Sequence, residues 1–199
     1  MRSLNNHNVV RYRQELLRHA LVLGAVVALI WLFEGVDYLI LSGQLDQLGI
    51  QPRTWIGLRN IPASPFLHGG FGHLLANTLP FIVLGWLVML RRTSDFFFVS
   101  IVAMMVSGLG IWIFGASNSI HIGLSGVIFG YLGFLLLRGY LERSFSAILL
   151  ALVAIVFYGG MLWGLLPLQP GVSWLGHLFG FAGGCLAAYA LTSGRRSAG

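Results

Sequence analysis

Charged side chains are scarce in this chain: only 9% of its 199 residues are Asp, Glu, Lys or Arg, and lysine is absent. Soluble globular domains carry about 25% charged residues. The composition therefore excludes a protein whose whole surface faces water. Its 57% share of hydrophobic residues excludes intrinsic disorder, which has the opposite composition. The single cysteine, Cys185, excludes an intrachain disulfide and a cysteine-based metal cluster.

All basic residues are arginines, and these twelve outnumber the six acidic residues to give a net charge of +6. A basic chain can bind nucleic acid, but a basic patch needs a polar surface to lie on, and this sequence offers none. We therefore interpret the arginines as signals of membrane topology and expect no nucleic-acid partner.

Long apolar stretches dominate the sequence and predict an all-α membrane protein with six transmembrane helices. A helix needs about 20 apolar residues to cross about 30 Å of hydrocarbon. The six stretches that reach or approach this length are residues 19–41, 73–90, 95–115, 124–138, 146–168 and 173–192. The first contains Glu34 and Asp37 and lacks a small-residue cleavage site, so it is not a signal peptide.

We expect one membrane domain, because neither a repeat nor a dividing linker interrupts the chain. Its predicted limits are 19–192, with a cytoplasmic flank at 1–18, a cytoplasmic tail at 193–199 and a long first loop at 42–68. Ten of the twelve arginines fall on the side of the two termini, and only Arg53 and Arg59 fall on the other. The positive-inside rule then places both termini in the cytoplasm. The short tails favour a bacterial plasma membrane.

The fourth apolar run is unusually short. From Leu124 to Leu137 it has 14 residues, which rise about 21 Å in a helix. The preceding segment, 115–123, is polar and rich in glycine, and lipid tolerates such backbone only where protein or water surrounds it. We expect this helix to begin below the outer membrane surface.

Four polar residues are predicted to lie at one depth. His73 and Asn77 open the second span, Ser125 opens the fourth, and His177 lies about one turn into the sixth. These spans all run from outside to inside, so their first turns share the outer leaflet. Polar residues inside a membrane are costly and indicate function.

This set of side chains can perform acyl transfer. Ser125 is a candidate nucleophile and His177 a candidate general base. His73 and Asn77 share a helix face and, with the Ser125 backbone amide at a positive helix end, could stabilise an oxyanion. Small residues spaced by four, Gly126 and Gly130 in the fourth span and Gly176, Gly180 and Gly184 in the sixth, predict a close contact between these spans.

The same residues carry a family resemblance. His68-x4-His73-x3-Asn77 resembles the signature of the rhomboid intramembrane serine proteases, Gly123-x-Ser125-Gly126 resembles their nucleophile motif, and Gly176-His177 with Gly180 and Gly184 resembles their last helix. The resemblance covers residues 46–184. Phe129 stands where tyrosine is common, and the Trp-Arg pair of some first loops is absent.

The resemblance implies a serine endopeptidase that cleaves transmembrane protein substrates near the outer face. It implies a dyad of nucleophile Ser125 and base His177, and an oxyanion site of His73, Asn77 and the Ser125 amide. Gly123, Gly126, Phe129, Gly180 and Gly184 would support the site, and His68 would be structural or hydrogen-bonding. No metal, cofactor or nucleotide is expected. The fifth span and residues 166–173 are expected to gate the cavity.

Other interpretations remain open at this point. A catalytically silent relative that binds membrane clients is the main alternative, and a proton or solute channel lined by the same polar residues is another. Each residue also has a structural interpretation, such as interhelical hydrogen bonding for His177. We interpret His121 as structural, or as facing the water that hydrolysis needs, and Glu34 and Asp37 as polar residues of the outer rim. The sequence does not indicate an oligomeric state.

Overall fold

The computed structural model describes residues 2–169 and 171–196, with side chains described over 8–169 and 171–193. The described residues form helices and loops without a β-strand, apart from one isolated bridge between Ile50 and His121. The elements are α1 (Arg2–Val36), the π-helical turn η1 (Asp37–Leu41), η2 (Gln44–Leu48), α2 (Trp55–Arg59), η3 (Ser64–Phe66), α3 (Phe71–Met89), α4 (Thr93–Phe114), α5 (Ser125–Glu142), α6 (Phe145–Tyr158), η4 (Gly159–Leu165) and α7 (Trp174–Arg196).

Within the described residues, five helical segments are long and apolar enough to cross a membrane: Asn8–Leu41, Phe71–Met89, Thr93–Phe114, Phe145–Leu165 and Trp174–Ser193. They correspond to five of the six predicted spans. The remaining predicted span corresponds to α5, which is not among them. The all-helical architecture is therefore confirmed over the described residues, and the count of six spans stays a prediction.

Helix α5 is longer than the sequence predicts. It continues past the expected end at 138 to Glu142, so its 18 residues rise about 27 Å. Arg138 stands at the predicted end of this span, whereas in the structure it lies within the helix and its side chain is buried. Glu142, one turn later, accepts a hydrogen bond from Arg138 Nε at 3.0 Å and also pairs with Arg91. These ion pairs compensate the cost of burying the Arg138 charge.

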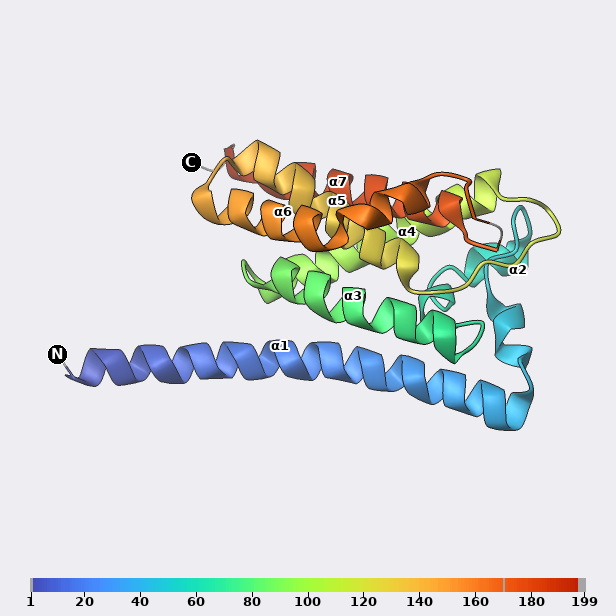
Figure 1. The fold of residues 1–199 in the computed structure, drawn as a ribbon, viewed down its shortest axis with the longest axis horizontal. Helices are drawn as coiled ribbons and strands as arrows, with labels where there is room; N and C mark the ends of the chain where they lie inside the picture. Colours follow the sequence, from blue (N-terminus) through green and yellow to red (C-terminus); the bar gives the residue numbers. More distant parts are fainter. Residues whose placement is uncertain (1, 170, 197–199) are drawn as a thin grey trace.

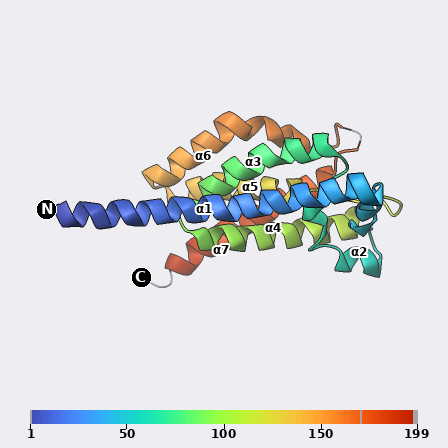
Figure 2. The ribbon, with the colours of Figure 1, turned by 90° about the horizontal axis from the view of Figure 1, so that it is seen from below.

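The helices pack around α5. It contacts α3, α4, α6 and α7, and its most extensive contact is with α7. Helix α1 lies outside this group and runs along α3, as both views show (Figures 1 and 2). Tyr131 and Phe134 of α5 are fully buried and join Phe81 of α3 in the hydrophobic core.

Glycines allow α5 and α7 to approach at backbone distance. A Cβ atom at Gly180 would collide with the carbonyl of Gly126, and one at Gly184 would collide with the carbonyl of Gly130. The fourth and sixth predicted spans are therefore in the close contact that their glycine spacing indicates. This contact sets the distance between the first turns of the two helices.

The longer loops gather at one end of the bundle (Figure 1). The start of α1 and the end of α7 lie at the opposite end, so the chain begins and finishes on one side (Figure 1). The first loop binds the segment between α4 and α5: Ile50 exchanges two backbone hydrogen bonds with His121, of 2.9 and 3.0 Å. Arg53 donates hydrogen bonds to the carbonyls of Ile113 and Gly115 at the end of α4. These contacts fix the loop that leads to Ser125.

Candidate active site

Ser125 and His177 are in hydrogen-bond contact. Ser125 is the first residue of α5, and His177 lies in the first turn of α7. The Ser125 Oγ atom is 2.9 Å from His177 Nε2. The glycine contact between the two helices brings these side chains together, although 52 residues separate them in the sequence.

The other ring nitrogen of His177 contacts a backbone carbonyl. His177 Nδ1 is 2.9 Å from the carbonyl oxygen of Gly164 in η4. A carbonyl only accepts hydrogen bonds, so Nδ1 carries the proton of the neutral ring. Nε2 is then the acceptor, and it faces the Ser125 hydroxyl. This is the tautomer that a general base for Ser125 needs.

Phe129 fixes the plane of the His177 ring. The two rings stack with centroids 4.1 Å apart and an angle of 10° between their planes. Gly164 packs against both: a Cβ atom there would lie 2.9 Å from Phe129 Cζ and 3.3 Å from His177 Nδ1. Glycine at this position lets its carbonyl reach the imidazole while the phenyl ring stays in place.

His73 and Asn77 line the same cavity as Ser125 and His177, which has a volume of about 860 Å³. Asn77 is buried, and its Nδ2 group has no hydrogen-bond partner among the described residues. An unpaired donor in a buried position is costly. It is available to a negatively charged oxygen in the cavity.

The turn before Ser125 requires glycine. Gly123 has a φ of +113°, and a Cβ atom there would lie 2.8 Å from His73 Cε1. Its N–H donates to the Ser64 carbonyl at 2.9 Å, which ties the turn to η3. The Ser125 amide belongs to the first turn of α5, whose N–H groups lack partners within the helix. The predicted oxyanion donors therefore come from two helices, with His73 and Asn77 in α3 and the Ser125 amide in α5.

His68 lies behind His73 rather than in this cavity. Its ring contacts the His73 ring edge to face at 5.1 Å, and it is 2% exposed. Burial, followed by the nearby His73, lowers the pKa of His68 to about 4. His68 lines a separate cavity of about 390 Å³ together with Glu34, Asp37 and Asp46.

Glu34 and Asp37, which the sequence predicts as polar residues of the outer rim, are both buried. The first loop folds back over the end of α1, and Leu45 N donates to Asp37 Oδ1 at 2.9 Å. Neither acid lines the cavity of Ser125 and His177.

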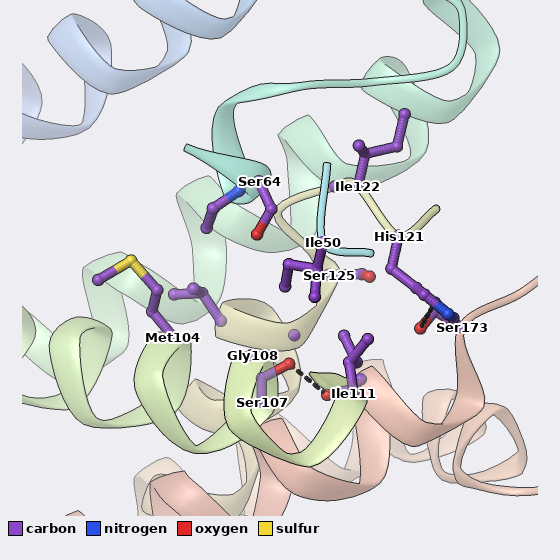
Figure 3. A pocket seen from close by; sticks show the side chains of 15 residues that line it. Ile50, Ser64, Met104, Ser107, Gly108, Ile111, His121, Ile122, Ser125 and Ser173 are labelled. Carbon is purple, nitrogen blue, oxygen red and sulfur yellow. Dashed lines mark hydrogen bonds between the residues drawn. The ribbon is translucent and has the colours of Figure 1, made fainter. Parts of the chain in front are cut away.

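Sequence reasoning missed two hydroxyl groups that hold the first turn of α7. Ser107 of α4 donates to the Gly176 carbonyl at 2.8 Å, and Ser173 contacts His121 Nδ1 at 2.7 Å (Figure 3). Burial lowers the pKa of His121. A small cavity of about 20 Å³ lies among Ser107, His121 and Ser125. A serine hydroxyl that bonds to a group far away in the sequence has no sequence motif, so neither contact could be predicted.

The part of the chain that the structure describes contains no group of three His, Cys, Asp or Glu side chains able to hold a metal ion. Of the segment expected to gate the cavity, residues 171–173 line it with Met161 of η4. Position 170 lies outside the described residues.

Comparison with known proteins gives a consistent assignment. Residues 57–194 match the rhomboid domain, and this range contains the whole candidate site. An uncharacterized protein of Mycobacterium bovis and one of Mycobacterium tuberculosis are each 42% identical over 180 residues, which cover 86% of this chain and 75% of the relative. An uncharacterized protein of Mycobacterium leprae is 39% identical, over 85% of this chain and 70% of its own. The chain is a multi-pass membrane protein and belongs to the rhomboid family.

Proposed function

We propose that this protein is an intramembrane serine endopeptidase that hydrolyses peptide bonds in or next to transmembrane helices. The observation that carries the proposal is the chain of contacts from Ser125 Oγ through the His177 ring to the Gly164 carbonyl. It supplies a nucleophile, a base in the required tautomer and a group that orients the base.

In the proposed reaction, His177 Nε2 takes the Ser125 hydroxyl proton while Oγ attacks the carbonyl carbon of the substrate. The imidazolium donates through Nδ1 to Gly164, whose carbonyl stabilises the positive charge in the position that a carboxylate occupies in a triad. The proton on Nε2 then moves to the leaving amine. Water attacks the resulting ester, with His177 again acting as base, and Ser125 is regenerated.

The tetrahedral intermediate carries its negative charge on the former carbonyl oxygen. We assign its stabilisation to His73, Asn77 and the Ser125 amide. The support is their common cavity and the Asn77 Nδ2 group, which has no hydrogen-bond partner among the residues that the structure describes.

The proposed substrate is a transmembrane helix that reaches the cavity from the side. Helix α6 has a largely exposed apolar surface: Val156 and Phe157 are 74% and 75% exposed. It lies beside α3 (Figure 2), and η4, which follows α6, contributes Met161 to the cavity wall. A displacement of α6 with the segment before α7 would admit a substrate between α3 and α6.

We also propose that both termini are cytoplasmic in a bacterial plasma membrane and that the cavity opens toward the outer face. The arginine distribution supports this orientation. The start of α1 and the end of α7 lie at the same end of the bundle, which is consistent with both termini being on one side of the membrane.

A fluorophosphonate probe tests the proposed nucleophile. The purified protein in bilayer nanodiscs should be labelled at Ser125, as identified by mass spectrometry, and labelling should disappear in Ser125→Ala and His177→Ala. The exposed Ser94→Ala in α4 is the matched control and should label normally. A protein that binds transmembrane clients but is not labelled and does not cleave them would be the silent relative instead.

A further inference from the structure

His121 links three parts of the chain at the loop end of the bundle. Its backbone N–H and carbonyl both bond to Ile50 of the first loop, at 3.0 and 2.9 Å. Its ring lies between two hydroxyl groups, with Nε2 2.8 Å from Ser119 Oγ and Nδ1 2.7 Å from Ser173 Oγ. The first loop therefore immobilises the backbone from which this ring extends.

The direction of these hydrogen bonds follows from the Ala116 carbonyl, which can only accept. Ser119 Oγ donates its proton to the Ala116 carbonyl at 2.6 Å, so it accepts from His121 Nε2–H. In the neutral ring Nδ1 is then an acceptor, and the Ser173 hydroxyl donates to it. Burial lowers the pKa of His121 and so favours this neutral ring.

Ser173 connects the immobilised His121 ring to His177, the proposed base. It immediately precedes α7, and its carbonyl accepts the His177 N–H at 3.1 Å. Residues 166–169 on the other side of the segment are all exposed. Figure 3 shows the His121 and Ser173 side chains pointing toward each other from the two loops.

We propose that His121 is a positioning residue, which holds Ser173 and thereby the first turn of α7 so that His177 stays within reach of Ser125. The proposal rests on the proposed function, because it assigns His121 an effect on the reaction through His177. It adds a fixed link between the segment before Ser125 and the segment before His177.

Two conservative variants separate the two bonds of the ring. The amide of His121→Asn reaches the position of Nδ1 and can keep the Ser173 contact. The longer side chain of His121→Gln reaches the position of Nε2 and can keep the Ser119 contact. His121→Ala removes both bonds, and Ser173→Ala removes one from the other side. The exposed Asn118→Ala of the same loop is the control.

The rate of fluorophosphonate labelling measures the reactivity of Ser125. We expect a fall of about tenfold in His121→Ala, His121→Gln and Ser173→Ala, since a displacement of about 1 Å near the chemistry can cost up to about a hundredfold. His121→Asn should retain most of the wild-type rate. The His121→Ala, Ser173→Ala double variant should be no slower than either single variant, because the two residues act through one bond.

Hydrogen exchange provides a readout that does not need activity. Peptides covering 171–180 should exchange faster in His121→Gln than in His121→Asn, with both variants measured at the same pH and below their unfolding temperatures. Equal labelling rates and equal exchange in these two variants would overturn the positioning role. A wild-type protein that is not labelled at Ser125 would overturn the proposed function alone, and the exchange comparison would still decide whether His121 holds α7.

Discussion

The carbonyl oxygen of Gly164 and the Nδ1 atom of His177 are 2.9 Å apart. This hydrogen bond joins η4 to α7 and fixes the protonated nitrogen of the imidazole. In serine hydrolases with a triad, a carboxylate has this role. A neutral carbonyl orients the ring without introducing a buried charge, which suits a site inside a membrane.

Gly164→Ala should reduce activity. Its methyl group would lie 2.9 Å from Phe129 Cζ and 3.3 Å from His177 Nδ1, so one of the rings has to move. We expect the labelling rate at Ser125 to fall by about 10- to 100-fold. Gly160→Ala is the control within the same 3-10 helix, since a Cβ atom there meets nothing within 4 Å. Equal rates in both variants would contradict the orienting role of Gly164.

Asn77→Ala should impair catalysis without destabilising the fold. Removal of one oxyanion donor costs about 10²- to 10³-fold in rate. Asn77 Nδ2 has no hydrogen-bond partner among the described residues, so its loss breaks no such bond in the free protein. Cleavage kinetics should show the decrease in kcat, and thermal unfolding should be close to that of the wild type. A kcat that is unchanged would remove Asn77 from the oxyanion site.

Gly180→Val should separate α5 from α7. Its Cβ would collide with the Gly126 carbonyl, and overpacking costs about 1–3 kcal/mol. Activity should fall at temperatures where circular dichroism still reports a folded bundle, because the Ser125 and His177 side chains depend on this contact. Gly24→Ala in α1, where a Cβ atom meets nothing within 4 Å, is the control. Normal turnover in Gly180→Val would argue against the role of the close contact.

The stability of the protein should fall between about pH 6.5 and about pH 4 through His68. Its pKa is lowered to about 4 from an ordinary value of 6.5. The folded state therefore binds fewer protons than the unfolded state in this range, and acid favours unfolding. Above about pH 6.5, the ordinary pKa of histidine, the contribution of neutral His68 to the free energy of unfolding is fully present. Between pH 7 and pH 5, the unfolding temperature of His68→Gln should fall less than that of the wild type. An equal fall in both proteins would show that His68 does not cause the pH dependence.

Much of the helical framework could be predicted from hydropathy, because a membrane span needs a long apolar run. The glycine spacing also indicated the contact of α5 with α7, since only small residues allow such an approach. The extension of α5 through Arg138 could not be predicted, because it depends on Glu142 and Arg91 meeting in the folded chain.

In the candidate site too, some residues could be predicted from the sequence, whereas others are brought into the site only by the fold. Ser125, His73, Asn77 and His177 could be found because their side chains are polar in apolar surroundings. The Gly164 carbonyl could not, because every residue has a carbonyl and only the break of α6 into η4 turns this one toward His177. The pairing of His121 with Ser173 similarly requires the fold of two loops.

The most direct test of the proposed function is cleavage of a transmembrane protein in proteoliposomes, with the products identified by mass spectrometry. The test substrate should have a helix-breaking residue near the outer end of its span. The wild type should produce two fragments cut within or next to the span, and Ser125→Ala and His177→Ala should produce none. Persistent cleavage by Ser125→Ala, or intact substrate with a folded wild type across a panel of such substrates, would contradict the assignment of Ser125 and His177 as a catalytic dyad.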